Sequence, residues 1–370
     1  MKIASINGLR GLAIIAVIFH HSFYTAFAYG KGSSQLPLIV QNIFSSGWLG
    51  VNLFFMLSGV VLFLPYARQT RHLSSASDAF SFYKHRFHRL MPLYWFACFV
   101  TLVFATNFRL DDPRFYDWLV RFALVTFPFS QQTFFPVSNG ILWSIGIEIW
   151  FSALFPLLIF LVHRFGWKPF LVAVFLLSFA TRLAGQILLC QVDYGLILNS
   201  ISDSVLGRLD DFVLGMLLAH LITRPESHRL FTLTNMLIGV LGIVFTTELW
   251  GTWLGKGLPS WSASLFSLPL NLSLFFVIGY LATPAKTGRT VIRSFFENRL
   301  FQMLGMMCYS LYVWHALIKL RFNSSYIIGV SEYLAYLTTV LIISSLTYRY
   351  IEFGKERNIK YLLPTRQQNS

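Results

Sequence analysis

The chain has 370 residues, of which 55% are hydrophobic and 12% charged, and its mean hydropathy is +0.61. This composition excludes a soluble globular protein and is typical of a chain that crosses a membrane several times. The formal net charge of +14 would suit a nucleic-acid partner. However, lysine and arginine are concentrated in alternate loops, as in membrane proteins, so we expect the lipid bilayer and no nucleic acid as a partner.

Ten apolar segments approach the ~20 residues that a membrane helix requires. We therefore predict an all-α fold, a polytopic membrane helix bundle with about ten transmembrane helices. The spans are residues 8–28, 46–66, 90–107, 142–163, 168–189, 204–222, 234–251, 264–284, 301–321 and 330–350. Basic loops follow the even-numbered spans, which predicts that both termini are cytoplasmic. Residues 1–355 then form one membrane domain and residues 356–370 a cytoplasmic tail.

The first span holds ionisable side chains inside an apolar segment, at Arg10, His20 and His21. Arg10 and His21 are eleven positions apart, close to three turns at about 100° per residue, so a regular helix puts them on one face. The rise between them is roughly 16 Å, so His21 lies near mid-depth when Arg10 is at a membrane surface. Ionisable groups at that depth are costly and commonly functional, so we predict that His21 is catalytic. His20 faces another direction, and both packing and substrate binding stay open for it.

Three further features bear on topology and redox chemistry. The sequence Ala26-Phe27-Ala28 is similar to a signal-peptidase site, but polar residues at positions 20–22 interrupt the apolar core before it, so we expect no cleavage. The apolar stretch 118–127 in the long outer loop is too short to cross the membrane and predicts an interfacial helix or a cap. Neither a disulfide framework nor metal-ligand spacing is visible, so we expect no metal; the three cysteines are Cys98, Cys190 and Cys308.

The second and third spans carry two candidate binding motifs. The segment 50–59 is rich in small residues, which favours close helix packing, and its Asn52 is a candidate to line a cavity. Arg86 and Arg89 precede the third span and are neighbours three positions apart if this segment is helical. They are either a positive-inside anchor or a clamp for phosphate groups, which guanidinium pairs bind well. Coenzyme A carries several phosphates and is one ligand that such a clamp would suit.

Further ionisable candidates lie in the later spans. Glu148 is about six residues inside the fourth span, roughly 9 Å from its outer end, at a depth similar to that of His21. A carboxylate there can orient a histidine base, as in hydrolytic triads. Otherwise Glu148 pairs with an arginine of a neighbouring span, Arg182 or Arg208, for structure. Four more residues are candidates for substrate binding, and for each the alternative is a structural role in ion pairing or packing. They are Arg182, Arg208, Asp211 and His315.

Taken together, five stretches resemble the bacterial acyltransferase type 3 family of integral membrane O-acyltransferases. They are residues 7–13 followed by His21, residues 50–59, residues 86–95, residues 143–148 and residues 309–315. The resemblance implies an enzyme of the bacterial inner (cytoplasmic) membrane that transfers an acyl group, usually acetyl, from cytoplasmic acyl-CoA. It implies as acceptor a hydroxyl of an envelope glycan or lipid-linked glycan, such as O-antigen or exopolysaccharide.

The resemblance also assigns roles to individual residues. It implies that His21 is the essential histidine, acting as base or acyl carrier, and that Arg10, Arg86 and Arg89 are essential or donor-binding arginines. Some family members carry an additional extracytoplasmic hydrolase-like domain. Transfer through such a domain would require a separate partner here, and a homo-oligomer is the other partner we consider. Trp150, directly before Phe151, departs from the family pattern without touching the proposed chemistry.

The alternative function is a transporter or flippase for a polar lipid or a sugar. Histidine, arginine and glutamate inside membrane helices also mark proton-coupled transport. The sequence lacks a matching pair of glycine- or proline-broken spans in its two halves, which inverted-repeat transporters often have. The densest basic cluster lies in a predicted cytoplasmic loop, which favours a soluble anionic donor.

Overall fold

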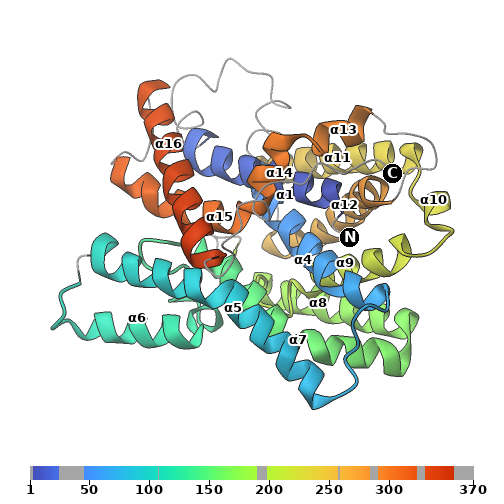
Figure 1. Ribbon diagram of the computed structural model, residues 1–370, viewed down its shortest axis with the longest axis horizontal. Coiled ribbons are helices and arrows are strands. Elements are labelled where there is room, and N and C mark those ends of the chain that lie inside the picture. The colour runs from blue at the N-terminus through green and yellow to red at the C-terminus, as the bar shows by residue number, and fades with distance from the viewer. Residues whose placement is uncertain are drawn as a thin grey trace. The chain divides into compact units, whose positions relative to one another are not determined.

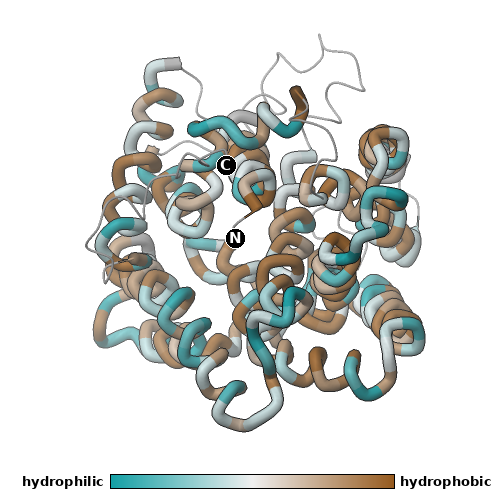
Figure 2. The backbone as a smooth tube through the Cα atoms, turned by 45° about the vertical axis from the view of Figure 1, so that its right-hand side comes forward, coloured by the Kyte–Doolittle hydropathy of each residue, from teal (hydrophilic) through white to brown (hydrophobic). Residues whose placement is uncertain are grey.

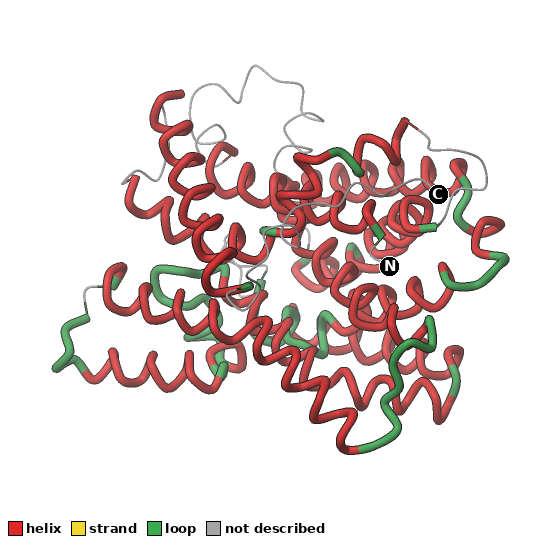
Figure 3. The backbone as a smooth tube through the Cα atoms, viewed as in Figure 1, coloured by secondary structure: helices red, strands yellow, loops and turns green. Residues whose placement is uncertain are grey.

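The computed structural model describes residues 3–24, 46–106, 108–189, 198–256, 259–283, 291–322 and 330–353. Within these ranges the regular elements are all helical and no strand occurs (Figure 3). The all-α prediction is therefore confirmed. Hydrophobic residues occupy long stretches of most helices (Figure 2), as membrane-crossing segments require. The segments Ala26-Phe27-Ala28 and 356–370, together with Cys190, lie outside the described residues.

Eight described helices are long and apolar enough to cross a membrane, and they match eight of the ten predicted spans. They are Ala4–Ser22, Ser46–Ala67, Ala76–Phe104, Leu142–Phe165, Trp167–Leu189, Leu233–Gly251, Trp261–Ala282 and Ser331–Glu352. The pair Arg299–Met306 and Cys308–Phe322 is bent by 73° and makes a ninth span if it is counted as one. The predicted number of about ten is not confirmed over the described ranges, and the membrane side of each terminus stays a prediction.

The predicted span 204–222 differs most from the structure. Residues up to 208 form turns, and helix α9 (Leu209–Ile222) has only 14 residues. At 1.5 Å per residue that is about 21 Å, shorter than the ~30 Å hydrocarbon core of a bilayer. The difference arises because residues 199–204 bond to one another and to neighbouring helices through polar side chains, which compete with helix formation.

The chain folds as two compact units, which we describe separately. Unit 1 contains Met1–Val51, His88–Phe115 and Pro284–Ser370, and unit 2 contains Asn52–Phe87 and Tyr116–Thr283. Three of the four boundaries fall inside helices, so each of these helices contributes residues to both units. They are α4 (Leu49–Ala67), α5 (Ala76–Val100) and α6 (Pro113–Leu124).

In unit 1, helix α1 (Ala4–Phe19) packs closely on two short helices, α13 (Val291–Phe296) and α14 (Arg299–Met306). Two glycines in the stretch of residues 7–13, Gly8 and Gly11, make this close approach possible. A Cβ atom on Gly8 would overlap the backbone carbonyl of Phe296, and one on Gly11 would overlap that of Phe301. Helices α15 (Cys308–Lys319) and α16 (Val330–Thr347) lie side by side in the same unit (Figure 1).

Three helices of unit 1 end in π-helical turns. These turns are His20–Tyr24 after α1, Thr101–Ala105 after α5 and Tyr348–Glu352 after α16. A π-turn bonds residue i to i+5 and is commonly found at functional sites. Because the turn is wider, the 100° rotation that aligned Arg10 with His21 does not apply through the end of the first span.

In unit 2, α4 and α9 approach closely, because Gly59 lies against the backbone at Phe212 and Gly215 lies against the backbone at Met56. The packing role predicted for the small residues of segment 50–59 is therefore confirmed for Gly59. The ring of Phe212 also stacks on that of Phe151 of α7 (Leu142–Phe165), with centroids 3.8 Å apart. The unit also contains α8 (Trp167–Leu189), α10 (Ser227–Leu230), α11 (Leu233–Lys256) and α12 (Ser267–Ala282), of which α11 and α12 run side by side (Figure 1).

The predicted interfacial segment forms α6, a helix of 12 residues and hence too short to cross the membrane. Asp112 caps its start by accepting from the backbone N–H of Arg114 at 2.9 Å, with proline at the first helical position. Hydrogen bonds from the Arg114 side chain hold the pKa of Asp112 below its ordinary value. Farther along, Phe122 is buried while Asp117 and Arg121 pair on an exposed face, which is the amphipathic pattern of an interfacial helix.

Candidate active site

His21 lies in the π-turn after α1, in unit 1, beside a second buried histidine. Its Nδ1 is 2.9 Å from the carbonyl oxygen of Val17 and 3.3 Å from Nε2 of His315. Lys319, one turn beyond His315 on α15, donates from Nζ to the backbone carbonyl of His21. The ring of His20 meets that of His21 edge to face, with centroids 5.1 Å apart. The first and ninth predicted spans therefore bring three histidines and a lysine together.

His315 is fixed from several directions. Its Nδ1 lies 2.7 Å from the carbonyl oxygen of Tyr312, and its own carbonyl accepts from the hydroxyl of Tyr336 on α16 at 3.2 Å. The preceding Trp314 donates from its indole nitrogen to Thr347 at 3.0 Å. His315 is fully buried. The sequence placed this histidine in the ninth span, but only the structure brings it next to His21.

Arg89 in unit 1 pairs with a carboxylate that the sequence analysis did not assign to the site. Its guanidinium forms an ion pair with Glu352, in the π-turn after α16, and lies 4.8 Å from the centroid of the Phe353 ring. Glu352 also accepts from the hydroxyl of Ser310 at 2.7 Å. The charge of Arg10 stabilises the same carboxylate electrostatically. Of the predicted arginines, Arg89 therefore pairs directly with the buried Glu352, and Arg10 acts on this carboxylate through its charge.

Glu148 and Arg86 form an ion pair in unit 2. The Nη2 of Arg86 is 3.1 Å from Oε1 of Glu148, and the hydroxyl of Ser58 donates to the same oxygen at 3.0 Å. Arg86 also donates to Ser152 at 2.9 Å, and the hydroxyl of Ser152 donates to the carbonyl of Glu148. Glu148 is thus paired with Arg86, rather than with Arg182 or Arg208. His21 belongs to unit 1, so its predicted contact with Glu148 stays a prediction.

Asn52 lies in the unit 2 part of α4 and is almost fully buried. Its side-chain nitrogen has no hydrogen-bond partner within the described ranges. An unsatisfied buried donor costs about 1–3 kcal/mol, so a bound group that accepts a hydrogen bond would be stabilising at this position. The role predicted for Asn52 in substrate binding is compatible with this observation and stays a prediction.

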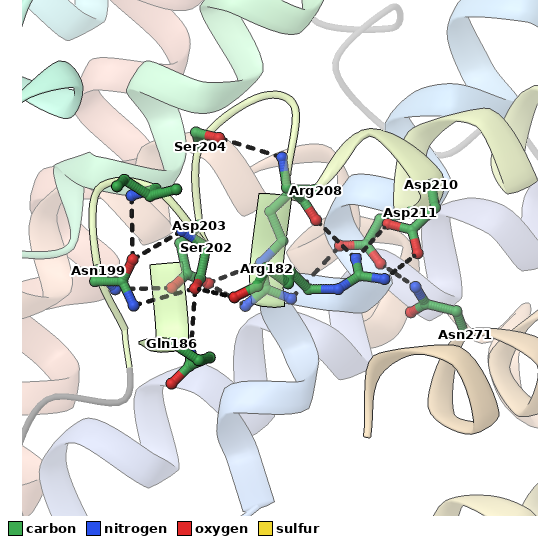
Figure 4. A network of polar contacts seen from close by, with 12 residues as sticks. Arg182, Gln186, Asn199, Ser202, Asp203, Ser204, Arg208, Asp210, Asp211 and Asn271 are labelled. Carbon is green, nitrogen blue, oxygen red and sulfur yellow. Dashed lines mark hydrogen bonds and ion pairs between the residues drawn. The ribbon is translucent and has the colours of Figure 1, made fainter. Parts of the chain in front are cut away.

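The other predicted substrate residues form a buried charge network in unit 2 (Figure 4). Arg182 binds the carboxylate of Asp210 through two hydrogen bonds of 2.7 and 2.9 Å. Arg208 binds Asp203 at 2.9 Å and lies 3.6 Å from Asp211, which also accepts from the side chain of Asn271. These contacts tie the turns before α9 to helices α8, α9 and α12. Arg182, Arg208 and Asp211 therefore pair with neighbouring polar residues, and their role toward substrate stays a prediction.

Comparisons with known proteins identify the class to which this chain belongs. A family model described as an acyltransferase domain matches residues 3–349, nearly the whole chain. The chain therefore belongs to the acyltransferase type 3 family that its motifs resemble, and the prediction of this family is confirmed.

The chain is similar to curated proteins named O-acetyltransferase OatA. To the protein of Staphylococcus aureus strain NCTC 8325 / PS 47 it is 24% identical over 370 aligned residues, which cover 94% of this chain and 56% of that protein. The same values apply to the proteins of strains COL and MRSA252. The chain thus spans little more than half the length of these relatives. No solved structure matches it.

Proposed function

We propose that this chain is a multi-pass enzyme of the bacterial inner membrane that transfers an acetyl group from acetyl-CoA, or another acyl group from its acyl-CoA, to a hydroxyl of a cell-envelope glycan. Membership in an acyltransferase family and the similarity to O-acetyltransferases support the acyl transfer. The observation that carries the proposal furthest is the meeting of His21 and His315 from opposite ends of the chain. Both histidines lie in stretches that carry the family resemblance.

In this proposal His21 acts as the general base. A neutral imidazole removes the proton of the acceptor hydroxyl as its oxygen attacks the thioester carbonyl carbon. The tetrahedral intermediate then collapses with cleavage of the carbon–sulfur bond, and the CoA thiolate takes the proton from the imidazolium. In the second route, the imidazole nitrogen attacks the thioester carbonyl carbon, the carbon–sulfur bond breaks and the CoA thiolate leaves. The acceptor hydroxyl then attacks the acyl-histidine, the carbon–nitrogen bond breaks, and the hydroxyl proton goes to the thiolate.

The arginines supply the donor site in this proposal. In unit 1, the positive charges of Arg10 and Arg89 both act on the carboxylate of Glu352, and two arginines beside one carboxylate leave positive charge to attract a phosphate. In unit 2, Arg86 is the other arginine that we propose for donor binding, and it lies three positions before Arg89 on helix α5. Guanidinium groups bind phosphate oxygens through paired hydrogen bonds, and the carboxylates serve as their counter-ions while no donor is bound.

The test uses purified protein in nanodiscs with radiolabelled acetyl-CoA and an envelope glycan preparation. We expect His21→Ala to reduce transfer by about 10²–10⁴-fold, the usual contribution of a general base. His163→Ala, at an exposed position near the end of α7, is the matched control and should retain transfer. Full transfer by a folded His21→Ala protein would overturn the assignment.

A transporter or flippase is the second candidate function. The buried network of Arg182 and Asp210 favours it, because ionisable pairs inside membrane bundles also serve proton-coupled transport. The two functions differ in their products. Proteoliposomes that take up a sugar or polar lipid along a proton gradient without releasing CoA would support transport, whereas CoA release that requires a glycan acceptor would support acyl transfer.

A further inference from the structure

We propose that His315 is a positioning residue that fixes the tautomer of His21, so that Nε2 of His21 is the basic nitrogen. This inference rests on the proposed function of His21 as a base. It deepens that proposal because it assigns the reacting atom and the group that sets it. The argument follows one chain of hydrogen bonds from a backbone carbonyl through both imidazole rings.

The first step fixes the protonation of His315. Its Nδ1 lies 2.7 Å from the carbonyl oxygen of Tyr312. A carbonyl oxygen only accepts, so the proton of the contact is on Nδ1. His315 is fully buried, which strongly disfavours an imidazolium, and a neutral imidazole carries only one N–H. Nε2 of His315 therefore carries a lone pair and acts as an acceptor.

The second step transfers this constraint to His21. Nε2 of His315 is 3.3 Å from Nδ1 of His21, and the carbonyl oxygen of Val17 is 2.9 Å from the same Nδ1. Both neighbours are acceptors, so Nδ1 of His21 must donate. In the opposite tautomer the Nδ1 lone pair would face two other lone pairs. The arrangement therefore places the proton of neutral His21 on Nδ1 and its lone pair on Nε2.

The same contacts stabilise the ring after it has taken a proton. When Nε2 of His21 receives the hydroxyl proton, the Nδ1–H becomes a stronger donor to His315 and Val17. An aspartate performs this orienting task in hydrolytic triads, and here a neutral imidazole performs it. Among the described residues of unit 1, the charged and titratable groups facing His21 are His20 on its own turn and His315 and Lys319 on α15. None of them is a carboxylate, so orientation by the partner, not charge compensation, is what His315 provides.

The matched variants are His315→Leu and His315→Gln. Leucine removes the acceptor, whereas the side-chain oxygen of glutamine can accept near the position of Nε2. We expect His315→Leu to lower kcat by about 10- to 100-fold, as is usual for groups that orient a functional histidine, with an unchanged KM for acetyl-CoA. We expect His315→Gln to recover most of the lost rate. Equal rates for leucine and glutamine variants, or a loss confined to KM, would overturn the proposal.

A second measurement is independent of activity. The chain has nine histidines, and ring-¹⁵N labelling of them, with His21 assigned by its loss in His21→Gln, reports which ring nitrogen carries the proton. Wild-type protein above neutral pH should show His21 protonated at Nδ1, and His315→Leu should show a mixture of tautomers. A wild-type His21 protonated at Nε2 would overturn the inference. If His21→Ala were fully active, the proposed function would fail, but this spectrum would still decide the tautomer.

Discussion

The ion pair between Arg182 and Asp210 provides the sharpest test of whether the charge network of unit 2 is structural. The side chain of Asp210 is fully buried and that of Arg182 is 6% exposed. Asp210→Asn leaves a buried guanidinium without its carboxylate, which typically costs about 3–5 kcal/mol in the free energy of unfolding. That cost is a shift of roughly 100- to 5,000-fold in the folding equilibrium. The double variant Arg182→Met with Asp210→Leu removes both charges and should be close to neutral.

Unfolding of the purified variants in mixed micelles, followed by helical circular dichroism during titration with sodium dodecyl sulfate, measures these differences. The control is Asp117→Asn, whose carboxylate forms an exposed pair with Arg121 and should contribute at most about 1 kcal/mol. Equal small effects of Asp117→Asn and Asp210→Asn would refute the reasoning. Acetyl transfer by the double variant then separates the two roles of Arg182: a stable but inactive protein would indicate a role toward substrate, and a stable and active one a structural role.

Three further predictions concern donor binding and helix packing. Arg86→Ala and Arg89→Ala should each weaken acetyl-CoA binding by about 10- to 100-fold, because a charge-assisted hydrogen bond contributes about 1.5–3 kcal/mol. Isothermal titration calorimetry measures the Kd, and unchanged values would contradict the assignment of these arginines to the donor site. Glu352→Gln should tighten CoA binding several-fold, because it releases the guanidinium of Arg89 from its competing carboxylate; an unchanged or weaker affinity would mean that the carboxylate does not compete. Gly8→Ala should lower the yield of folded protein in size-exclusion chromatography, because its Cβ would overlap the backbone of α13, whereas Gly140→Ala meets only ordinary contacts and should behave as wild type.

Much of the fold was predictable because the bilayer allows few solutions. Backbone groups in hydrocarbon must bond within a helix, so hydropathy and length alone located eight spans. The prediction failed at residues 204–222, because a hydropathy window counts apolar residues without recognising turns held by polar side chains. Ser202, for example, donates to the carbonyl of Arg182 and accepts from Asn199, bonds that the sequence does not reveal. The π-turns were likewise invisible, since α and π geometry share the same apolar pattern.

The candidate site was predictable in its residue types and unpredictable in its partners. Ionisable residues inside apolar spans identified His21, Glu148 and Arg10, and the basic cluster before the third span identified Arg86 and Arg89. Their partners depend on which helices pack together. Arg89 pairs with Glu352, which is 263 positions later in the chain, and Glu148 pairs with Arg86 instead of Arg182 or Arg208. A single sequence shows which ionisable groups are present, but it does not show how far apart they lie in the folded protein.

The wide turn at His20–Tyr24 separates two tasks that one continuous helix would have to combine. A π-turn holds one residue more than the α-turn it replaces, so the side chains after it follow a different phase from those before it. Gly8 and Gly11 set the seating of α1, while the phase shift sets where the imidazole of His21 points. Deleting or inserting a single residue in this turn would change the direction of the His21 imidazole and leave the packing of helix α1 unchanged. The orientation of the histidine can therefore change without a change in the helix packing around it.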